Sequence, residues 1–405
     1  MNNFDSIICV GQTTWEGDFQ KAVVQLMTEL SARHRVLYVD YQFTLKDWLM
    51  GIMNRRPVPV RKLMRLSNPL TKKVVDTGGE VYVWTPPLIL PVNWLPAKPH
   101  DWLVRWNVRR VVKGLRRVMR QLNMTHPLVV NGLNPVFGLP MLNQLNEYAT
   151  IYYCFDEITI AKWMSRHGSR YEPEYLQRVN AVVTTSETLR RSKALLQSKA
   201  YCVKNGVNFD LFNQARQLID VRPDSNPIVG YLGSADDRIN LELVEFCVQT
   251  MPDVTFQFVG EVHEEAITLR LSRYPNVVFT PPRQPADLPP LLAGMSAAMI
   301  PFVCNEHTYT IYPLKINEYL AAGLPVVSTP FSILNDFDGV VELAASPADF
   351  AQALRRALAD TSVTRVEERI SMAKNNSWKK RAEEFEVVIG QLVQDQTPTP
   401  IPVTH

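Results

Sequence analysis

Lys315 and Glu318 are charged residues in a segment that is otherwise mostly apolar. The segment, YPLKINEYLAAGLPVVSTP at residues 312–330, has the period of a short helix, then a Gly-Leu-Pro break and a β-branched run typical of a strand. Because proline is tolerated in the first turn of a helix, we expect this helix to begin at Pro313 or Leu314. The free N–H groups of its first turn would then bind an anion such as a diphosphate.

Glu318 lies about one turn beyond the predicted anion site. Its carboxylate can accept hydrogen bonds from two vicinal hydroxyls, such as those of a ribose, and Lys315 would add a cation near the phosphates. An anion site and a diol acceptor at this spacing fit a nucleotide diphosphate. The alternative is that Lys315 and Glu318 pair on an ordinary helix surface, and the spacing alone leaves both interpretations open.

Two series of apolar strands, separated by segments of helix length, would position these residues. The first series comprises residues 7–10, 35–40, 81–84, 128–131, 150–155 and 181–185, and the second comprises 227–233, 254–260, 276–282, 297–302 and 325–329. This alternation predicts an α/β chain with two Rossmann-like domains joined near Lys204 and a cleft between them. Ligands of such sheets bind outside the carboxyl ends of the strands, and the segment before Lys315 follows a strand in this way.

Composition places this chain of 405 residues among proteins with ordinary apolar cores. It is 46% hydrophobic, and no stretch approaches the roughly 18 apolar residues that a spanning helix requires. The first residues do not resemble a secretory signal. The five cysteines are odd in number, far apart and set in apolar surroundings, which predicts reduced, buried thiols in a cytoplasmic protein.

Residues 301–330 resemble the donor-binding signature of the group 1, retaining glycosyltransferases of the GT-B fold, and most closely their bacterial cell-surface polysaccharide branch. That pattern runs Pro-x-Lys-x-x-Glu-Tyr-x-Ala-x-Gly-x-Pro-Val-Val. Every fixed position is filled, by Pro313, Lys315, Glu318, Tyr319, Ala321, Gly323, Pro325, Val326 and Val327. Further blocks in the family's order are YYCFDE, AVVTTSETL, KNGVNFDLF, GYLGSADDRINLEL and FVGEV. The resemblance covers nearly the whole chain and is weakest between residues 42 and 126.

The resemblance implies a GT-B domain order. Residues 1–203 would form the acceptor-binding domain and 204–374 the nucleotide-sugar-binding domain, both Rossmann-like. Residues 375–393 would form a helix that crosses back to the first domain, with Trp378 as its packing aromatic. The Pro/Thr-rich tail, 394–405, is expected to be disordered.

The implied activity is a glycosyltransferase of hexosyltransferase type. It would move a sugar, with retention, from a nucleotide diphosphate donor to a hydroxyl of a lipid-linked glycan, in biosynthesis of a cell-surface polysaccharide such as an exopolysaccharide. We expect neither a metal nor another cofactor for this activity. Two alternatives remain: a nucleotide-sugar epimerase of the same fold, for which the histidines form no obvious set, and a non-catalytic nucleotide-sugar-binding partner of another transferase.

On the donor side, the resemblance assigns the ribose to Glu318 and the diphosphate to the amides around residues 311–315, a segment that includes Pro313 and Leu314. Gly233 and Arg238 follow the first strand of the second domain, where an arginine can neutralise the leaving diphosphate. The alternative for this arginine is a surface ion pair with Asp236, Asp237 or Glu242.

Further donor contacts are expected from the hinge and from the segment before the helix. Asn205 and Gly206 lie at the predicted hinge. Many relatives carry a glutamate eight positions before the ribose glutamate, and Thr310 stands there. The contacts to the donor sugar would then come from elsewhere in this segment, with the candidates Asn305, Glu306 and Thr308.

On the acceptor side, the loop GQTTWEGDF contains the candidates Gly11, Trp15, Glu16 and Gly17. A tight turn before an ordinary helix would have the same pattern. Asp156 follows a predicted strand, and the resemblance places it where relatives carry a cleft-facing His or Asp that could orient the acceptor hydroxyl or take its proton. The competing role of Asp156 is to cap a helix. The catalytic candidates are therefore Asp156, Arg238 and Lys315.

The N-terminal part of the chain is basic. Residues 1–150 carry 19 Lys+Arg against 10 Asp+Glu, although the net charge of the whole chain is only +3. Residues 101–123 predict an amphipathic helix with an apolar face and a basic face. The basic face holds Arg105, Arg109, Arg110, Lys113, Arg116, Arg117 and Arg120. This face suits anionic lipid headgroups at the inner surface of the plasma membrane. A solvated helix face is the alternative, and the acidic second half argues against nucleic acid.

Overall fold

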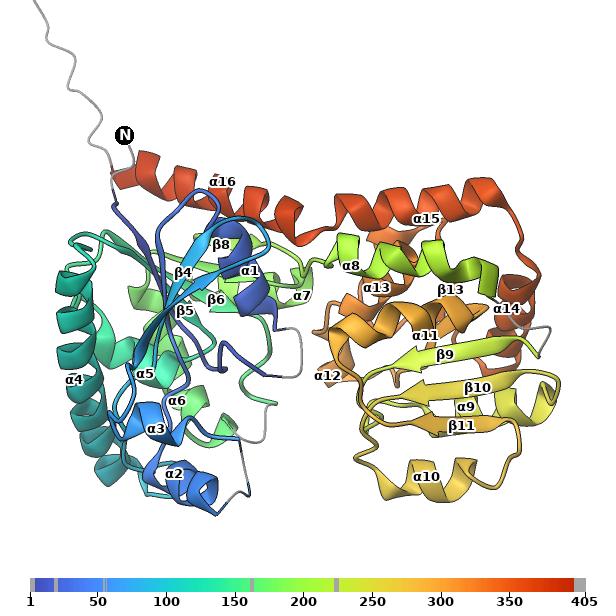
Figure 1. The fold of residues 1–405 in the computed structure, drawn as a ribbon, viewed down its shortest axis with the longest axis horizontal. Helices are drawn as coiled ribbons and strands as arrows, with labels where there is room; N and C mark the ends of the chain where they lie inside the picture. The colour runs from blue at the N-terminus through green and yellow to red at the C-terminus, as the bar shows by residue number, and fades with distance from the viewer. Residues whose placement is uncertain are drawn as a thin grey trace, which may run out of the picture. The chain divides into compact units, whose positions relative to one another are not determined.

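The computed structural model describes residues 4–17, 21–53, 55, 57–160, 164–221 and 226–396. These residues form two compact units, each with its own sheet (Figure 1). We call residues 4–17, 21–204 and 382–396 the N-terminal unit, and residues 205–221 and 226–381 the C-terminal unit.

The sheet of the N-terminal unit has the strand order β3-β4-β2-β1-β5-β6-β7-β8. Neighbouring strands are parallel, except that β3 is antiparallel to β4. Neither β3 nor β8 was predicted, because β3 carries lysines in a partly exposed strand and β8 has only three residues. The strands are β1 Ile7–Val10, β2 Val36–Val39, β3 Leu70–Val74, β4 Glu80–Trp84, β5 Leu128–Gly132, β6 Ala149–Cys154, β7 Ala181–Thr184 and β8 Ala200–Cys202.

The sheet of the C-terminal unit has the order β11-β10-β9-β12-β13-β14, and all its neighbours are parallel. The strand β14 was not predicted, because three residues are too few to show a period. The strands are β9 Ile228–Leu232, β10 Thr255–Val259, β11 Val277–Thr280, β12 Ala297–Ile300, β13 Val326–Ser328 and β14 Val341–Leu343.

Helices connect the strands of each unit. In the N-terminal unit they are α1 Ala22–Leu30, α2 Leu45–Ile52, α3 Val60–Leu63, α4 Ala97–Gln121, α5 Pro135–Met141, α6 Ser165–Arg178 and α7 Glu187–Ala194. The C-terminal unit has α8 Phe209–Asn213, η1 Gln214–Val221, α9 Leu241–Thr250, α10 Glu265–Leu271, η2 Pro285–Asp287, α11 Leu288–Gly294, α12 Glu306–Tyr309, α13 Leu314–Ala321, η3 Asn335–Phe337, α14 Pro347–Ala359 and α15 Val363–Asn375. The last helix is α16 Trp378–Gln396.

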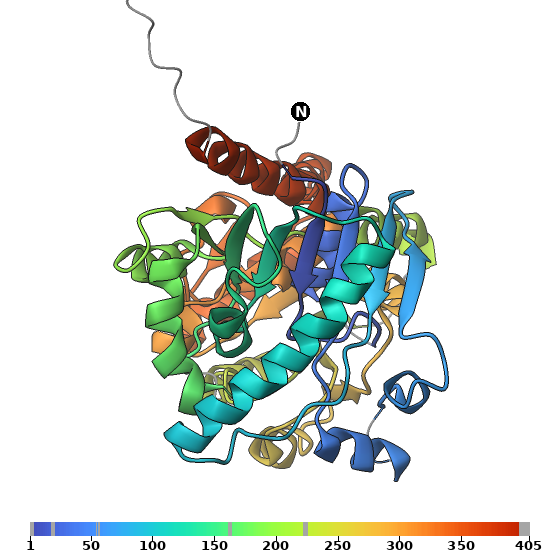
Figure 2. The same cartoon turned by 90° about the vertical axis from the view of Figure 1, so that its left-hand side faces the viewer.

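The basic helix α4 crosses one face of the N-terminal sheet (Figure 2). Its predicted apolar face is buried in the same core as strands β1 and β2, through Val104, Val108, Val111 and Leu115. Burying an aliphatic side chain contributes roughly 1.5–3 kcal/mol relative to leaving it exposed. The apolar face therefore holds α4 on the sheet while most of its arginines face solvent.

The helix α16 begins at Trp378, as the sequence suggested, but continues past the predicted end at Val393. Within the N-terminal unit it buries Phe385, Ile389 and other apolar side chains, and Phe385 meets Tyr153 of β6 edge to face. The first residues of the predicted disordered tail, 394–396, are therefore helical. Residues 397–405 lie outside the described residues.

The five cysteines are free thiols. Cys9, Cys154 and Cys247 are buried and Cys202 is partly buried, but Cys304 is exposed, so the prediction of burial is wrong there. Cys304 lies in the loop after β12, where the apolar run of the strand has ended. No helix in the described part of the chain is long and apolar enough to cross a membrane.

Candidate functional site

Helix α13 lies where the strand order of the C-terminal sheet reverses, between β9 and β12. It begins at Leu314, with Pro313 as its N-cap residue, as predicted. The hydroxyl oxygen of Tyr319 accepts a hydrogen bond from the N–H of Leu232 at 2.7 Å, which ties α13 to the end of β9. The first N–H groups of a helix have no partner within it, so the start of α13 presents donors at the switch point of the sheet.

The side chain of Lys315 lies against the bare backbone of Gly233, the residue that follows β9. A Cβ atom on Gly233 would be 2.2 Å from Cε and 2.7 Å from Nζ of Lys315, and Gly233 has a φ of +121°. A Cβ atom on Gly260, which follows β10, would be 2.3 Å from the carbonyl oxygen of Gly233. Glycine is therefore required at both positions, and at Gly233 it leaves room for the side chain of Lys315.

The side chains of Lys315 and Glu318 make no hydrogen bond or ion pair with any residue that the structure describes, although both residues are partly buried. Burial lowers the pKa of Lys315, and the nearby carboxylate of Glu318 opposes this shift. Burial raises the pKa of Glu318, and Lys315 opposes this shift in turn. The alternative of an ion pair on a helix surface is therefore wrong, and both charged groups are available to a ligand.

Arg238 forms the ion pair that its alternative interpretation predicted. Its Nε and one terminal nitrogen donate to the two carboxylate oxygens of Asp236, at 2.8 and 2.6 Å. The guanidinium carbon lies 5.3 Å from the ring centre of Phe302. The charge of Arg238 lowers the pKa of Lys315, and the charge of Asp236 raises it. The ion pair of Arg238 with Asp236 is therefore close enough to Lys315 to act on its charge.

The residues before α13 have mainly local partners. Asn305 caps α12 and accepts the N–H of Thr308 at 2.9 Å, while the fully buried hydroxyl of Thr308 donates to the carbonyl of Val303 at 2.6 Å. Thr308 is therefore wrong as a sugar contact. The hydroxyl of Thr310 donates to the carbonyl of His307 at 2.7 Å.

The two hinge candidates differ in their surroundings. A Cβ atom on Gly206 would be 2.7 Å from the backbone nitrogen of Trp378, so the packing of Trp378 alone explains this glycine. Asn205 is buried, and its Oδ1 has no hydrogen-bond partner among the described atoms. Asn205 thus retains an unused acceptor.

The predicted acceptor loop in the N-terminal unit is held by local contacts. A Cβ atom on Gly11 would be 2.1 Å from the hydroxyl oxygen of Tyr38, and the N–H of Trp15 donates to Asp40 at 2.8 Å. Glu16 is exposed and pairs with Lys73 at 2.7 Å. Gly17 has a φ of +138°, which favours glycine.

A cavity of about 380 Å³ lies beside this loop, and we call it the switch-point cavity. It opens where the N-terminal sheet reverses between β1 and β5, and its lining includes Gln12, Gln42 and Asn134, which follow β1, β2 and β5. Asn134 donates to Gln42 at 3.0 Å, and Gln42 donates to the carbonyl of Gly11 at 3.1 Å. None of the four predicted loop residues lines this cavity. The missed signal was an amide side chain shortly after each strand.

Asp156 lies in a bend after β6, and its Oδ1 accepts the N–H of Glu157 at 2.8 Å. It caps no described helix, because the N-cap residue of α6 is Met164. Glu157 belongs to a buried ion network, in which Lys193 pairs with Glu157 at 3.0 Å and with Glu172 at 2.9 Å.

Replacing Lys193 with methionine is expected to lower the free energy of unfolding by about 3–5 kcal/mol, because two buried carboxylates lose their cation. Urea denaturation measures the change. The matched control is Arg191→Met on the same helix, since Arg191 is exposed and pairs with Glu187 at the surface. This control should change stability by less than about 1 kcal/mol. Equal effects of the two substitutions would contradict the burial of the network.

Residues 226–360, which contain Gly233, Lys315 and Glu318, match the family described as Glycosyl transferases group 1. This segment is a group 1 glycosyltransferase domain. The chain is also 25% identical over 265 residues to the putative teichuronic acid biosynthesis glycosyltransferase TuaH of Bacillus subtilis (strain 168), and the match covers 60% of this chain and 67% of that relative. These matches favour neither the epimerase nor the non-catalytic binding partner.

Solved structures show that the chain has the predicted GT-B fold. An α,α-trehalose-phosphate synthase from Burkholderia vietnamiensis superposes with a TM-score of 0.69 at 12% identity, over 98% of this chain and 100% of that one. Anabaena Alr3699/HepE, solved in complex with UDP, superposes with a TM-score of 0.64 at 14% identity, over 95% and 100% of the two chains. Within the residues that the structure describes, no group of three or more His, Cys, Asp or Glu is placed to hold a metal ion.

Proposed function

We propose that this glycosyltransferase transfers a hexose from a nucleotide diphosphate sugar to a hydroxyl of a lipid-linked glycan, in biosynthesis of a cell-surface polysaccharide. The observation that carries the proposal is the unpaired Lys315 and Glu318 at the start of α13, with Lys315 lying on Gly233. Glu318 would accept both ribose hydroxyls, and Lys315 with the first amides of α13 would hold the diphosphate. The name of TuaH supports a cell-surface polymer, and the UDP complex of HepE supports UDP as the nucleotide.

Transfer with retention and without a metal needs few side chains. The leaving diphosphate can help to deprotonate the acceptor, so catalysis would rest on positioning and on cations that stabilise the charge of the diphosphate. Lys315 would be the first such cation. Arg238, which also pairs with Asp236, would be the second.

On the acceptor side, Asp156 would orient the acceptor hydroxyl. Asn205, Asn305 and Thr310 remain the candidates nearest the donor sugar, and the loop with Gly11 and Trp15 beside the switch-point cavity would receive the glycan.

Calorimetric titration with UDP, GDP and ADP, followed by a panel of donor sugars of the tightest nucleotide, tests the proposal. We expect one nucleotide to bind most tightly and one of its sugars to be transferred. NMR of the product should show the anomeric configuration of the donor, and chelation of divalent metals should leave the rate unchanged. Tight binding with no turnover of any donor and acceptor would instead favour a non-catalytic role.

Nucleotide affinity should fall on both sides of neutral pH. Burial raises the pKa of Glu318 above 4.5 and lowers the pKa of Lys315 below 10.5, and the nucleotide needs an ionised carboxylate and a protonated amine. Binding therefore weakens as the pH falls through the raised pKa, and again as it rises through the lowered one. Titrations of UDP across pH measure both limbs. In Glu318→Gln, the fall of affinity at low pH should come only from protonation of the phosphate itself, which occurs near a pH of about 6. Identical acid limbs in both proteins would contradict the assignment.

We also infer that the enzyme acts in the cytoplasm, peripherally at the inner face of the plasma membrane. The support is the row of cations on the solvent face of α4, from Arg105 to Arg120, with no acid among them. Such a row is attracted to anionic lipids within about a Debye length. The lipid-linked acceptor would be found at the same surface.

A further inference from the structure

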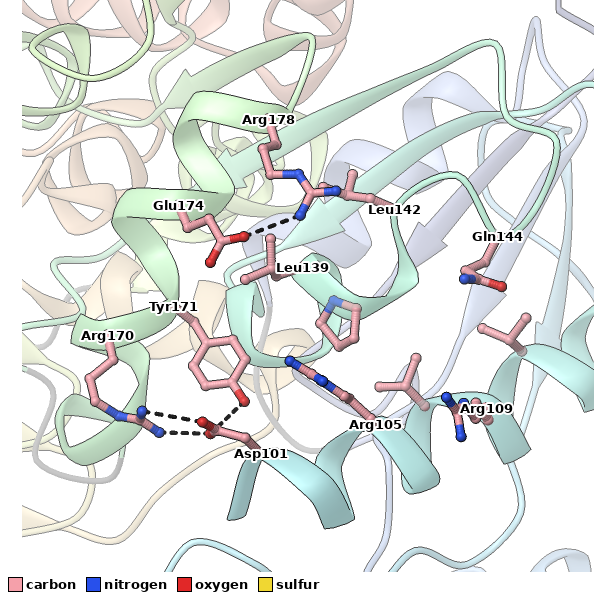
Figure 3. A pocket seen from close by; sticks show the side chains of 13 residues that line it. Asp101, Arg105, Arg109, Leu139, Leu142, Gln144, Arg170, Tyr171, Glu174 and Arg178 are labelled. Atoms are coloured by element: carbon pink, nitrogen blue, oxygen red, sulfur yellow. Dashed lines mark hydrogen bonds and ion pairs between the residues drawn. The ribbon is translucent and has the colours of Figure 1, made fainter. Parts of the chain in front are cut away.

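A second cavity, of about 430 Å³, lies in the N-terminal unit between α4 and α6 (Figure 3). We call it the arginine cavity. It shares no lining residue with the switch-point cavity, and Leu139, Pro140 and Leu142 on and after α5 give it an apolar wall. Its charged lining comprises Asp101, Arg105, Arg109, Arg170, Glu174 and Arg178.

The two acids of the arginine cavity are already paired. Asp101 accepts from Arg170 at 2.8 Å and from the hydroxyl of Tyr171 at 2.8 Å. Although burial opposes it, the hydrogen bonds from Arg170, His100 and Tyr171 hold the pKa of Asp101 well below its usual range. Glu174 is within 3.1 Å of Arg178 (Figure 3). Neither carboxylate is therefore left to neutralise a further cation.

Arg105 and Arg109 are the two remaining cations of the cavity. They lie four residues apart on α4, on the side that lines the cavity, and neither guanidinium group has a hydrogen bond or ion pair in the described ranges of the chain. Two guanidinium groups one turn apart, without a counter-charge, can together bind a phosphate through charge-assisted hydrogen bonds. The arrangement thus favours an anion with several oxygens.

The surface next to these arginines indicates where the anion comes from. Trp102 and Trp106 flank Arg105 along α4, and their exposed fractions are 68% and 37%. Arg110 lies over the ring of Trp106 at 4.7 Å. Tryptophans with an exposed ring beside a row of cations are typical of a membrane interface, where the ring sits at headgroup level. A soluble phosphorylated ligand would require the cavity but not the exposed tryptophans.

We propose that the arginine cavity binds the phosphate headgroup of an anionic phospholipid, with Arg105 and Arg109 as its ligands and Trp102 and Trp106 in the interface. This proposal rests on the peripheral membrane location proposed above and assigns that contact to one site. It separates two kinds of cation on α4: those that contact a phosphate in the cavity, and those that only attract the bilayer through solvent.

Co-sedimentation of the full chain tests the site, with phosphatidylcholine vesicles that do or do not contain about 30% phosphatidylglycerol. The variant is Arg105→Gln with Arg109→Gln. The matched control is Arg117→Gln with Arg120→Gln, which removes the same charge from the same helix outside the cavity. In about 0.5 M salt, where attraction between exposed charges is largely screened, wild type and control should still bind the anionic vesicles. The cavity variant should bind them at least about tenfold more weakly.

Other outcomes would overturn the proposal. Equal losses in the two double variants would show a diffuse attraction and no site. Binding of inorganic phosphate or glycerol phosphate that needs both arginines, without binding to vesicles, would assign the cavity to a soluble phosphorylated ligand. Binding of a soluble polyuronate with the same dependence would assign it to an anionic glycan.

Two further measurements keep this test separate from that of the proposed function. Trp102→Ala with Trp106→Ala should weaken vesicle binding and leave the binding of glycerol phosphate unchanged. The affinity of the cavity variant for UDP should equal that of the wild type. If no nucleotide binds to any of these proteins but vesicle binding still depends on Arg105 and Arg109, the proposed function fails while the lipid site stands.

Discussion

Replacing Glu318 with alanine is expected to weaken nucleotide binding by about 100-fold or more, because two hydrogen bonds from ribose hydroxyls to a charged acceptor are lost, each worth about 1.5–3 kcal/mol. The chain should remain folded, since the side chain of Glu318 has no hydrogen bond or ion pair with a described residue. Calorimetric titration with UDP measures the affinity, and thermal unfolding without ligand measures the stability.

The sign of the pKa shift supports this separation of binding from stability. The pKa of Glu318 is raised in the folded protein, so the folded state favours the protonated carboxyl. Its contribution is therefore most favourable at low pH and is lost as the pH rises through the raised value. At neutral pH the ionised group costs stability, and its removal should leave the unfolding temperature unchanged or higher. A large decrease would show a structural role instead.

Two controls make the ribose assignment specific. Glu368→Ala removes an exposed carboxylate from α15 of the same unit and should leave nucleotide binding unchanged. Deoxy analogues of UDP that lack one ribose hydroxyl should bind the wild type more weakly than UDP does. With Glu318→Ala, UDP and its deoxy analogues should bind equally, since the acceptor that distinguishes them is absent. A deoxy penalty that persists in Glu318→Ala would place the ribose elsewhere.

The local structure of the proposed donor site could be predicted largely from the sequence because its rules are local. Pro313 starts a helix, and Lys315 and Glu318 share one face three residues apart, so the start of α13 and its two charges followed from spacing. The contact of Lys315 with Gly233 could not follow, since it depends on β9 lying beside β12 in the sheet. The role of Thr308 was wrong for a local reason, because Asn305 and Thr308 form a reciprocal cap of α12.

The proposed acceptor site was harder to predict. Gln12, Gln42 and Asn134 lie on three different connections, and neutral amides form no recognisable motif. Only the strand order β2-β1-β5 brings them to one edge, where Asn134 donates a buried hydrogen bond to Gln42 and Gln42 donates one to the carbonyl of Gly11. The arginine cavity was missed in a different way. The sequence showed the cations of α4, but Arg105 and Arg109 differ from Arg117 and Arg120 only through the helices that pack beside them.

Replacing Lys315 with methionine is expected to lower kcat by about 100- to 1000-fold, because a preorganised cation no longer stabilises the charge on the leaving diphosphate. Methionine keeps an unbranched side chain as far as the Cε position that lies on Gly233. The binding of uridine should be unchanged and that of UDP weakened, because only UDP presents the diphosphate. The exposed Lys374 of α15 provides the matched control, Lys374→Met, which should behave as the wild type.

The stability of the unliganded Lys315→Met variant distinguishes a functional lysine from a structural one. The pKa of Lys315 is lowered in the folded protein, so the charged amine disfavours the folded state at every pH below the lowered value. This cost disappears as the pH rises toward 10.5, where the unfolded chain also loses the proton. Methionine should therefore leave the free energy of unfolding unchanged or increase it at neutral pH, and the gain over wild type should shrink as the pH rises. A variant that keeps its kcat but unfolds more easily would assign Lys315 to the fold and remove it from catalysis.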